Sequence, residues 1–99
     1  MPGAAILITY KLAKNTSEQD FLPASEKMHG EFMSKQKGFI SWQILAEADT
    51  YTDVLIWETM EDAQNAMRAG GESTANQAFF SLFDPESIKM QFLTMKKSY

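Results

Sequence analysis

Residues 51–67, YTDVLIWETMEDAQNAM, decide the fold of this chain. Tyr51–Glu58 is rich in β-branched and aromatic residues, which predicts a strand. The pattern changes at Thr59, which forms a capping-box pair with Asp62 and so predicts the start of a helix. Apolar residues then repeat at helical spacing at Met60, Ala63, Ala66 and Met67. The stretch therefore predicts a strand that runs directly into a helix.

The residues before this stretch predict a strand, a helix and a second strand. Ala5–Leu12 alternates in polarity, with Ile6, Ile8, Tyr10 and Leu12 on one face. We expect a helix from about Asp20 to Lys37, with Asp20 as the N-cap, because Pro23 has no N–H and fits best in a first turn. Gly38 stands where a left-handed residue commonly ends a helix. Phe39–Ala46 predicts the next strand, with Ile40, Trp42, Ile44 and Ala46 on one face.

The residues after this stretch complete the order of elements. Gly70 and Gly71 end the helix, and Ser73 can cap a further short helix. Asp84-Pro85 predicts a turn, and Ile88–Met95 a last strand. The order βαββαβ predicts an α+β, ferredoxin-like fold with an antiparallel sheet, in one domain that spans residues 1–99.

Both helical regions are expected on one face of the sheet. The other face then holds Leu7 and Leu45 among Thr9, Ser41 and Gln43. Such a face is too apolar to leave in water. We therefore expect a homodimer, in which a second copy closes against it.

Composition excludes several classes of function. A net charge of −4 without a basic patch argues against nucleic-acid binding and against basic attachment to membranes. The chain has no cysteine and a single histidine, His29, so neither thiolate nor paired-histidine metal sites are expected. No signal-peptide pattern and no bilayer-spanning apolar run is present, which predicts a cytoplasmic protein.

A few side chains are candidates for a small-molecule site. His29 is the one group that titrates near neutral pH without help, so it is a candidate base; a half-buried helix histidine is the simpler alternative. Trp42 and Trp57 lie on neighbouring expected strands and, with Tyr10, Phe79 and Phe80, can wall an aromatic pocket. Two tryptophans in so small a domain can equally be core residues.

Two segments carry a family resemblance. Gly38-Phe39-Ile40 leads into the second expected strand, and Val54-Leu55-Ile56-Trp57-Glu58-Thr59 runs into Met60-Glu61-Asp62-Ala63. Here the chain resembles the antibiotic biosynthesis monooxygenase-type family of the dimeric α/β-barrel superfamily. In that family an apolar strand, a Trp-Glu-Ser or close variant and an Ala-rich helix follow one another. The element order matches over nearly the whole chain.

The resemblance implies a dimeric α/β barrel with an apolar cleft between sheet and helices in each subunit. Members oxidise quinols or anthrones with dioxygen and no prosthetic group, or bind and degrade haem. The haem-ligand histidine of the second branch falls near Gln77, and its helix tryptophan near Met67. Residues 60–83 contain no histidine, so haem is not expected.

Three functions remain open at this point. The first is a cofactor-independent monooxygenase for a quinol or anthrone, with His29 and Tyr10 as catalytic residues. Its substrate-binding residues are expected to be Trp42, Trp57, Met67, Gln77 and Phe80. The second is a non-catalytic binder of a small apolar molecule. The third is a dimeric structural or regulatory module without a ligand.

Overall fold

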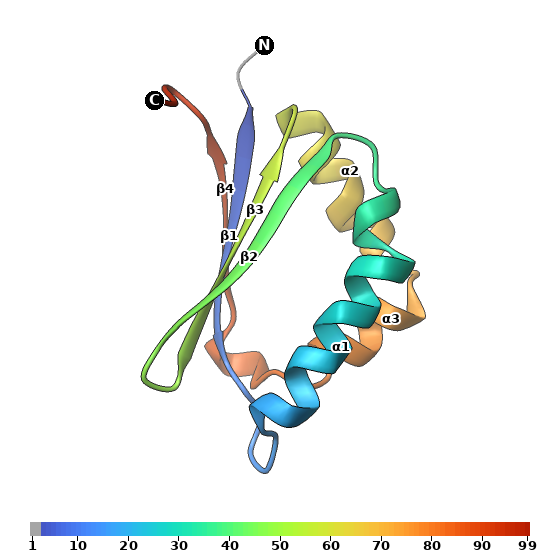
Figure 1. Cartoon of the computed structure of the whole chain (residues 1–99), viewed down its shortest axis with the longest axis vertical. Coiled ribbons are helices and arrows are strands. Elements are labelled where there is room, and N and C mark those ends of the chain that lie inside the picture. Colours follow the sequence, from blue (N-terminus) through green and yellow to red (C-terminus); the bar gives the residue numbers. More distant parts are fainter. Residues whose placement is uncertain (1–2) are drawn as a thin grey trace.

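A four-stranded antiparallel sheet carries all helices on one face (Figure 1). The computed structural model describes residues 3–99. Its elements are β1 (Ala4–Lys11), α1 (Glu18–Glu31), β2 (Phe39–Glu47), β3 (Thr50–Trp57), α2 (Met60–Gly70), α3 (Thr74–Phe80) and β4 (Lys89–Thr94), with short 3₁₀ turns at Met33–Lys35 and Pro85–Ser87. The strand order β2-β3-β1-β4 confirms the predicted α+β, ferredoxin-like fold. No helix within the described residues is long and apolar enough to cross a membrane.

Strict alternation on the two central strands creates the core. On β1 and β3 every second side chain is buried toward the helices, and the side chains between them face the other way. Helix α1 packs against this face, with Phe21 and Met28 almost fully buried. The helices therefore cover one sheet face because both partners bury an apolar surface there.

Helix α1 begins three residues earlier than the sequence predicts. Ser17, not Asp20, is the N-cap, and the Asp20 carboxylate accepts hydrogen bonds of 3.2 Å from both the N–H and the hydroxyl of Ser17. Pro23 consequently lies inside the helix, where it removes one backbone hydrogen bond. The capping interaction outweighs the proline preference on which the prediction rested. The helix also ends early, at Glu31 instead of Lys37.

A bulge at the start of β2 reverses the predicted alternation there. Phe39 pairs with Trp57 and Ser41 pairs with Ile56, with an irregularity between Phe39 and Ser41. Because one extra residue exchanges the faces, Phe39 packs against the core while Ile40 is 55% exposed. The prediction that Ile40 shares a face with Trp42 is therefore wrong.

The second sheet face is left without a helix (Figure 1). Leu7 pairs with Val54 across β1 and β3, and both side chains point to this face. Leu45 of β2 and Leu93 of β4 add apolar surface and are 55% and 41% exposed. The predicted mixture of apolar and polar side chains is thus present on the open face.

Candidate functional site

An apolar pocket of about 370 Å³ opens between α2, α3 and β4. Its size lies within the usual range for small-molecule sites. It brings together three of the five substrate-binding residues predicted from the sequence, Met67, Gln77 and Phe80. The full wall consists of Met67, Gly70, Gly71, Asn76, Gln77, Phe80 and Met90.

Local backbone signals form this wall. Helix α2 ends at Gly70, and Ser73 caps α3 by accepting a hydrogen bond from the Asn76 N–H at 3.3 Å. The Gln77 side chain donates to the Gly71 carbonyl at 2.9 Å, which ties α3 to the end of α2. Met90 comes from edge strand β4, where it pairs with Ile8. The pocket therefore lies where two short helices meet the edge of the sheet.

Asn76 is a polar residue of this wall that sequence reasoning missed. Its side chain is only 2% exposed, and its Oδ1 atom is buried without a hydrogen-bond partner in the structure. Buried polar atoms are nearly always paired, so an unpaired one at a pocket calls for an explanation. An asparagine in the first turn of a helix indicates a cap, and nothing in the local sequence reveals that its amide is buried.

A polar pair lies deeper, between the sheet and the helices. The Tyr10 hydroxyl donates a hydrogen bond to Asp53 Oδ1 at 2.7 Å, and both side chains are almost fully buried. Burial raises the pKa of Asp53 from 3.8 to about 6, while the hydrogen bond that the Tyr10 hydroxyl donates to the carboxylate lowers this pKa in part. Burial also raises the pKa of Tyr10, and the nearby Asp53 charge adds to this effect. The burial of Asp53 was not predicted from the sequence, because an acidic residue inside a strand usually faces water.

Aromatic rings fill the space around this pair. The rings of Tyr10 and Phe83 stack with centroids 3.8 Å apart, and Phe79 packs against both Phe21 and Phe83. The ring of Trp42 meets that of Phe79 edge-on, with centroids 5.5 Å apart, and the centroids of Phe79 and Phe80 are 5.7 Å apart. Trp42 and Tyr10 therefore stand behind the pocket wall and are not part of it.

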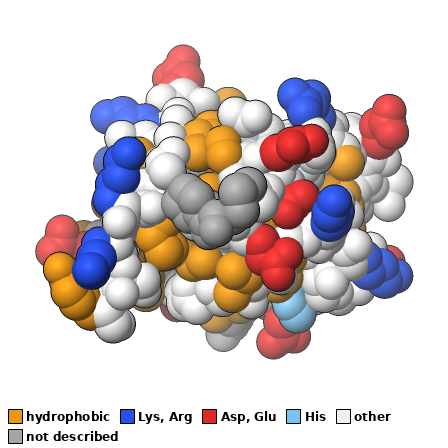
Figure 2. Space-filling view, turned by 90° about the horizontal axis from the view of Figure 1, so that it is seen from above, with side chains coloured by type: hydrophobic (Ala, Val, Ile, Leu, Met, Phe, Trp, Pro, Cys, Tyr) orange, Lys and Arg blue, Asp and Glu red, His pale blue; other side chains and the backbone are white. Residues whose placement is uncertain are grey.

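Trp57 lies at the opposite end of the sheet. Its side chain is fully buried, and it borders a separate hollow of about 630 Å³ with Ile40, Ile56 and Met95. In the view onto this end of the molecule, hydrophobic side chains gather near the middle of the face (Figure 2). The structure thus does not bring Trp57 together with Met67 and Phe80.

His29 occupies the outer surface of α1. It is exposed, and its ring lies 5.7 Å from that of Phe39. Figure 2 shows the histidine beside acidic side chains on the helix side of the molecule. It is not among the residues that line the pocket of Met67 and Phe80. The structure therefore separates His29 from Tyr10 and from the pocket.

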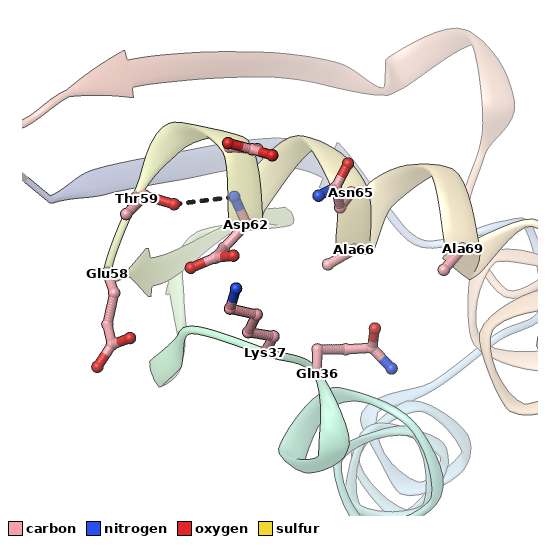
Figure 3. A pocket seen from close by; sticks show the side chains of 9 residues that line it. Gln36, Lys37, Glu58, Thr59, Asp62, Asn65, Ala66 and Ala69 are labelled. Atoms are coloured by element: carbon pink, nitrogen blue, oxygen red, sulfur yellow. Dashed lines mark hydrogen bonds between the residues drawn. The ribbon is translucent and has the colours of Figure 1, made fainter.

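A polar pocket of about 440 Å³ lies at the start of α2 (Figure 3). The predicted capping pair is confirmed here, because Thr59 Oγ1 accepts a hydrogen bond of 3.0 Å from the Asp62 N–H. The side chains of Lys37 and Asp62 point toward each other across the opening. Gly38, with φ of +81°, passes so close to Asp62 that a Cβ would collide with the carboxylate.

Comparison with known proteins identifies the fold. No protein-family model and no curated protein sequence matches the chain. Among solved structures, SnoaB, a cofactor-independent oxygenase from Streptomyces nogalater, superposes with a TM-score of 0.79 at 15% identity, over 99% of this chain and 97% of that chain. A protein of the antibiotic biosynthesis monooxygenase type from Bordetella bronchiseptica gives 0.71 at 18% identity, over 100% of both chains. A conserved protein from Methanosarcina mazei gives 0.73 at 14% identity, over 97% and 95%.

The chain has the fold of the antibiotic biosynthesis monooxygenase proteins. This confirms the resemblance seen in the segments around Phe39 and Trp57. At such low identities the likeness shows the fold, whereas activity depends on the residues of the site.

Within the antibiotic biosynthesis monooxygenase fold, the pocket of this chain has an uncharged wall. Thioether, phenyl and amide groups line it, and none of its residues titrates near neutral pH. No group of three or more metal-ligating side chains occurs within residues 3–99. The wall can bind and orient a flat apolar molecule, and any proton transfer would involve the substrate, water or a more distant group.

Proposed function

We propose that this chain is a cofactor-independent monooxygenase that oxidises a small electron-rich aromatic, of the quinol or anthrone type, in the pocket of Met67, Gln77 and Phe80. The observation that carries this proposal is the pocket itself, which is apolar and of suitable size. The likeness in fold to a cofactor-independent oxygenase supports the choice of reaction.

The proposed reaction requires few catalytic groups from the protein. In an anthrone, dioxygen converts the reactive CH₂ group to a carbonyl, and the second oxygen atom leaves as water. A quinol reacts with dioxygen to give a hydroxyquinone and water. In both cases the substrate supplies all four electrons that reduce dioxygen, so no external reductant is required. An apolar pocket contributes by holding the substrate and limiting access of water to it.

The proton acceptor is a separate part of the proposal. We keep His29 as the candidate base because it is the single imidazole of the chain. Tyr10 is kept as a candidate hydrogen-bond donor to the substrate, although its hydroxyl already donates a hydrogen bond to Asp53. A general base typically contributes about 10²–10⁴ in rate, so His29→Ala should slow oxidation by that order if His29 acts as one. An unchanged rate would exclude His29 as the base.

Oxygen uptake in the presence of an anthrone or a naphthohydroquinone tests the proposal. The informative variant is Gly71→Leu, because Gly71 belongs to the wall and a Cβ there meets only the Arg68 carbonyl oxygen, at 3.8 Å. Gly30→Leu is the matched control, since a Cβ at Gly30 has no neighbour within 4 Å. We expect the wild type and Gly30→Leu to accelerate uptake equally, and Gly71→Leu to lose the acceleration. Equal rates for all three proteins would place the reaction elsewhere.

We further propose that two copies pair through their open sheet faces to form the dimeric α/β barrel. The support is the uncovered apolar surface of Leu7, Leu45, Val54 and Leu93. Pairing would bury this surface and leave the pocket at α2 and α3 on the outside of the barrel wall.

A non-catalytic binding module is the second candidate. Two observations favour it: no side chain in the pocket wall titrates near neutral pH, and Phe21, Phe79 and Phe83 fill the space between sheet and helices. Both candidates predict binding of aromatics in this pocket. Saturable binding without any acceleration of oxygen uptake by the purified protein would decide for the binding module.

A further inference from the structure

Asp62 places a buried carboxylate in the wall of the polar pocket of about 440 Å³ at the start of α2. We propose that this pocket is a binding site for a small primary amine, whose ammonium group pairs with Asp62 and whose aliphatic chain lies along α2. The pocket shares no lining residue with that of Met67 and Phe80. The inference therefore adds a second ligand and does not rest on the proposed oxidation.

The Asp62 carboxylate has no partner among residues 3–99. Asp62 is only 8% exposed, and the hydrogen bond that it forms with Thr59 uses its backbone N–H and not its carboxylate. The ion pairs in this part of the chain lie elsewhere, at Lys11–Asp49 and Lys27–Glu31. Burying a carboxylate without a cation or hydrogen-bond donors destabilises the folded state. A bound cation would remove this cost.

Capping of α2 does not account for this carboxylate. In α1 the aspartate at the same helical position, Asp20, accepts a hydrogen bond of 3.2 Å from the backbone N–H of the N-cap residue Ser17. In α2, Thr59 caps the helix with its hydroxyl, and within the described structure its own N–H donates no such bond to Asp62. The carboxylate lies instead against Gly38 and points into the opening of the pocket (Figure 3).

The carboxylate is accessible from the pocket. The buried polar atoms that lack a partner in residues 3–99 belong to Trp42, Trp57 and Asn76, so the oxygens of Asp62, which also lack one, are not enclosed. Figure 3 shows Lys37 pointing toward Asp62 across the opening, but the two side chains form no ion pair. Because Lys37 is exposed, its side chain can turn into solvent when a ligand enters.

The wall beside Asp62 indicates the shape of the ligand. Asp62, Ala66 and Ala69 follow one another at i, i+4 and i+7, so they lie on one face of α2. Figure 3 shows the two alanines on the side of the helix that faces Gln36. Their short side chains leave room for an aliphatic chain, which would gain from contact with their methyl groups. The ligand is therefore expected to combine a charged end with an apolar stem.

The charge of the pocket favours a cation, and the spacing of its acids favours an organic one. Glu58 and Glu61 are exposed at the rim, so three carboxylates, including Asp62, stand against the one ammonium group of Lys37. No group of three or more acidic or histidine side chains in residues 3–99 lies close enough together to hold a metal ion. An ammonium group requires less, because its N–H groups can pair with one carboxylate and with neighbouring oxygen acceptors.

NMR titration of the isotope-labelled chain with butylammonium, butyrate and butanol tests the inference. The three probes have the same carbon chain and differ in charge, and the ionic strength is held constant with sodium chloride. We expect butylammonium at millimolar concentration to shift the backbone N–H signals of Gly38, Asp62 and Ala66 in a saturable way. Butyrate and butanol should leave these signals in place.

Variants locate the site. Asp62→Asn keeps the shape of the side chain and should weaken butylammonium binding by about tenfold or more, the scale of a hydrogen bond to a charged group. Asp49→Asn is the matched control, because it removes the same charge before the first residue of β3, whereas Glu58 follows the last. Lys37→Met removes the competing ammonium and should tighten binding. Ala69→Leu, the second variant if Asp62→Asn does not fold, fills the apolar wall and should abolish binding.

Several results would overturn the site. Unchanged binding to Asp62→Asn, or equal shifts with sodium chloride alone, would show that no specific ammonium contact exists. Tighter binding of butyrate than of butylammonium would show that Lys37 dominates the pocket. Binding to Lys37→Met but not to the wild type would show that Lys37 already neutralises Asp62 in solution. Displacement of butylammonium by an equal concentration of Mg²⁺ would assign the pocket to a metal ion.

Discussion

Tyr10 and Asp53 form a hydrogen bond of 2.7 Å within a core that is otherwise almost entirely apolar. The two residues lie on neighbouring strands, since Asp53 pairs with Ile8 and Tyr10 pairs with Tyr51. No salt bridge in the described part of the chain includes Asp53. Burying an ionised carboxylate without a cation destabilises the folded state, and protonation of the carboxylate removes this cost.

This pair should make folding stability depend on pH. The pKa of Asp53 is raised by burial from 3.8 to about 6, so the folded state binds a proton more tightly than the unfolded state. Its contribution to stability is therefore complete below pH 3.8 and is lost as the pH rises through 6. A shift of this size corresponds to about 3 kcal/mol in the free energy of unfolding. Because the carboxyl group is already mostly ionised in the unfolded state at pH 5, urea denaturation at pH 5 and pH 8 should show about half of this loss, on the order of 1.4 kcal/mol.

Substitution of the carboxyl group isolates its effect. Asp53→Asn cannot ionise and should be more stable than the wild type at pH 8, with a flatter dependence on pH. Asp49→Asn is the control, because Asp49 is exposed and pairs with Lys11 only at the surface. A wild type that is as stable at pH 8 as at pH 5, or an Asp53→Asn variant with the same pH dependence, would contradict a buried neutral carboxyl.

Gly30 and Gly38 should respond oppositely to alanine. Gly38 has φ of +81° and contacts Asp62, so Gly38→Ala adds backbone strain and a collision. We expect it to lower the free energy of unfolding by about 1–3 kcal/mol. Gly30 lies in α1 with free space around it, so Gly30→Ala should stabilise by about 0.5–1 kcal/mol. Thermal unfolding followed by circular dichroism measures both, and a neutral Gly38→Ala would show that the turn can relax.

The sequence was sufficient for the fold because its signals are local. Alternation on β1, the Thr59 cap and the glycines at the end of α2 each depend on a few neighbouring residues, and together they determine the order of elements. The errors arose where two local preferences compete. At the start of α1, the hydrogen bonds that Ser17 donates to the Asp20 carboxylate outweighed the preference of Pro23 for a first turn. At Phe39 a β-bulge exchanged the two faces of β2, and no residue type in the sequence predicts such a bulge.

The site was predicted only in part, because its assembly depends on long-range packing. Met67, Gln77 and Phe80 converge because α2 and α3 meet at the edge of the sheet. Trp42 and Trp57 were expected in the same wall, but Trp42 stands behind Phe79, and Trp57, the last residue of β3, borders a separate hollow. Burial of Asp53 and Asn76 depends on elements distant in sequence, which explains why neither was found.

The open sheet face should mediate dimerisation. Leu45→Glu places a charge on this face, where Leu45 is 55% exposed in a single chain, and should shift a homodimer toward monomers. Leu22→Glu is the matched control, because Leu22 is 43% exposed on α1, away from that face. Light scattering at micromolar concentration should give twice the chain mass for the wild type and for Leu22→Glu. A wild type with the mass of a single chain would contradict the proposed dimeric barrel.

Haem should not bind specifically to this chain. The helices after β3 carry no imidazole, since residues 60–83 contain no histidine, and His29 lies on the outer surface of α1. Titration with haem should therefore give no saturable one-to-one change in the Soret band. A clear axial-histidine spectrum that disappears in His29→Ala would contradict this expectation and would make His29 the ligand.

The ring of Phe80 should contribute to the affinity for flat aromatic ligands. Phe80→Leu keeps an apolar side chain in the wall but removes the aromatic face, whose interaction with another ring is worth about 0.5–1.5 kcal/mol. We therefore expect binding of naphthol to weaken by roughly two- to tenfold. Phe39→Leu is the matched control, because Phe39 packs near His29 and Trp57, away from this pocket.

Tryptophan emission then distinguishes the two hollows of the molecule. A ligand beside Phe80 is separated from Trp42 by Phe79 and touches neither indole, so contact quenching should be weak. A ligand in the hollow that Trp57 borders would instead quench strongly, and Trp57→Phe would abolish that signal. Strong quenching that depends on Trp57, combined with no effect of Phe80→Leu, would move the binding site to the end of the sheet and return it to the place that the sequence alone suggested.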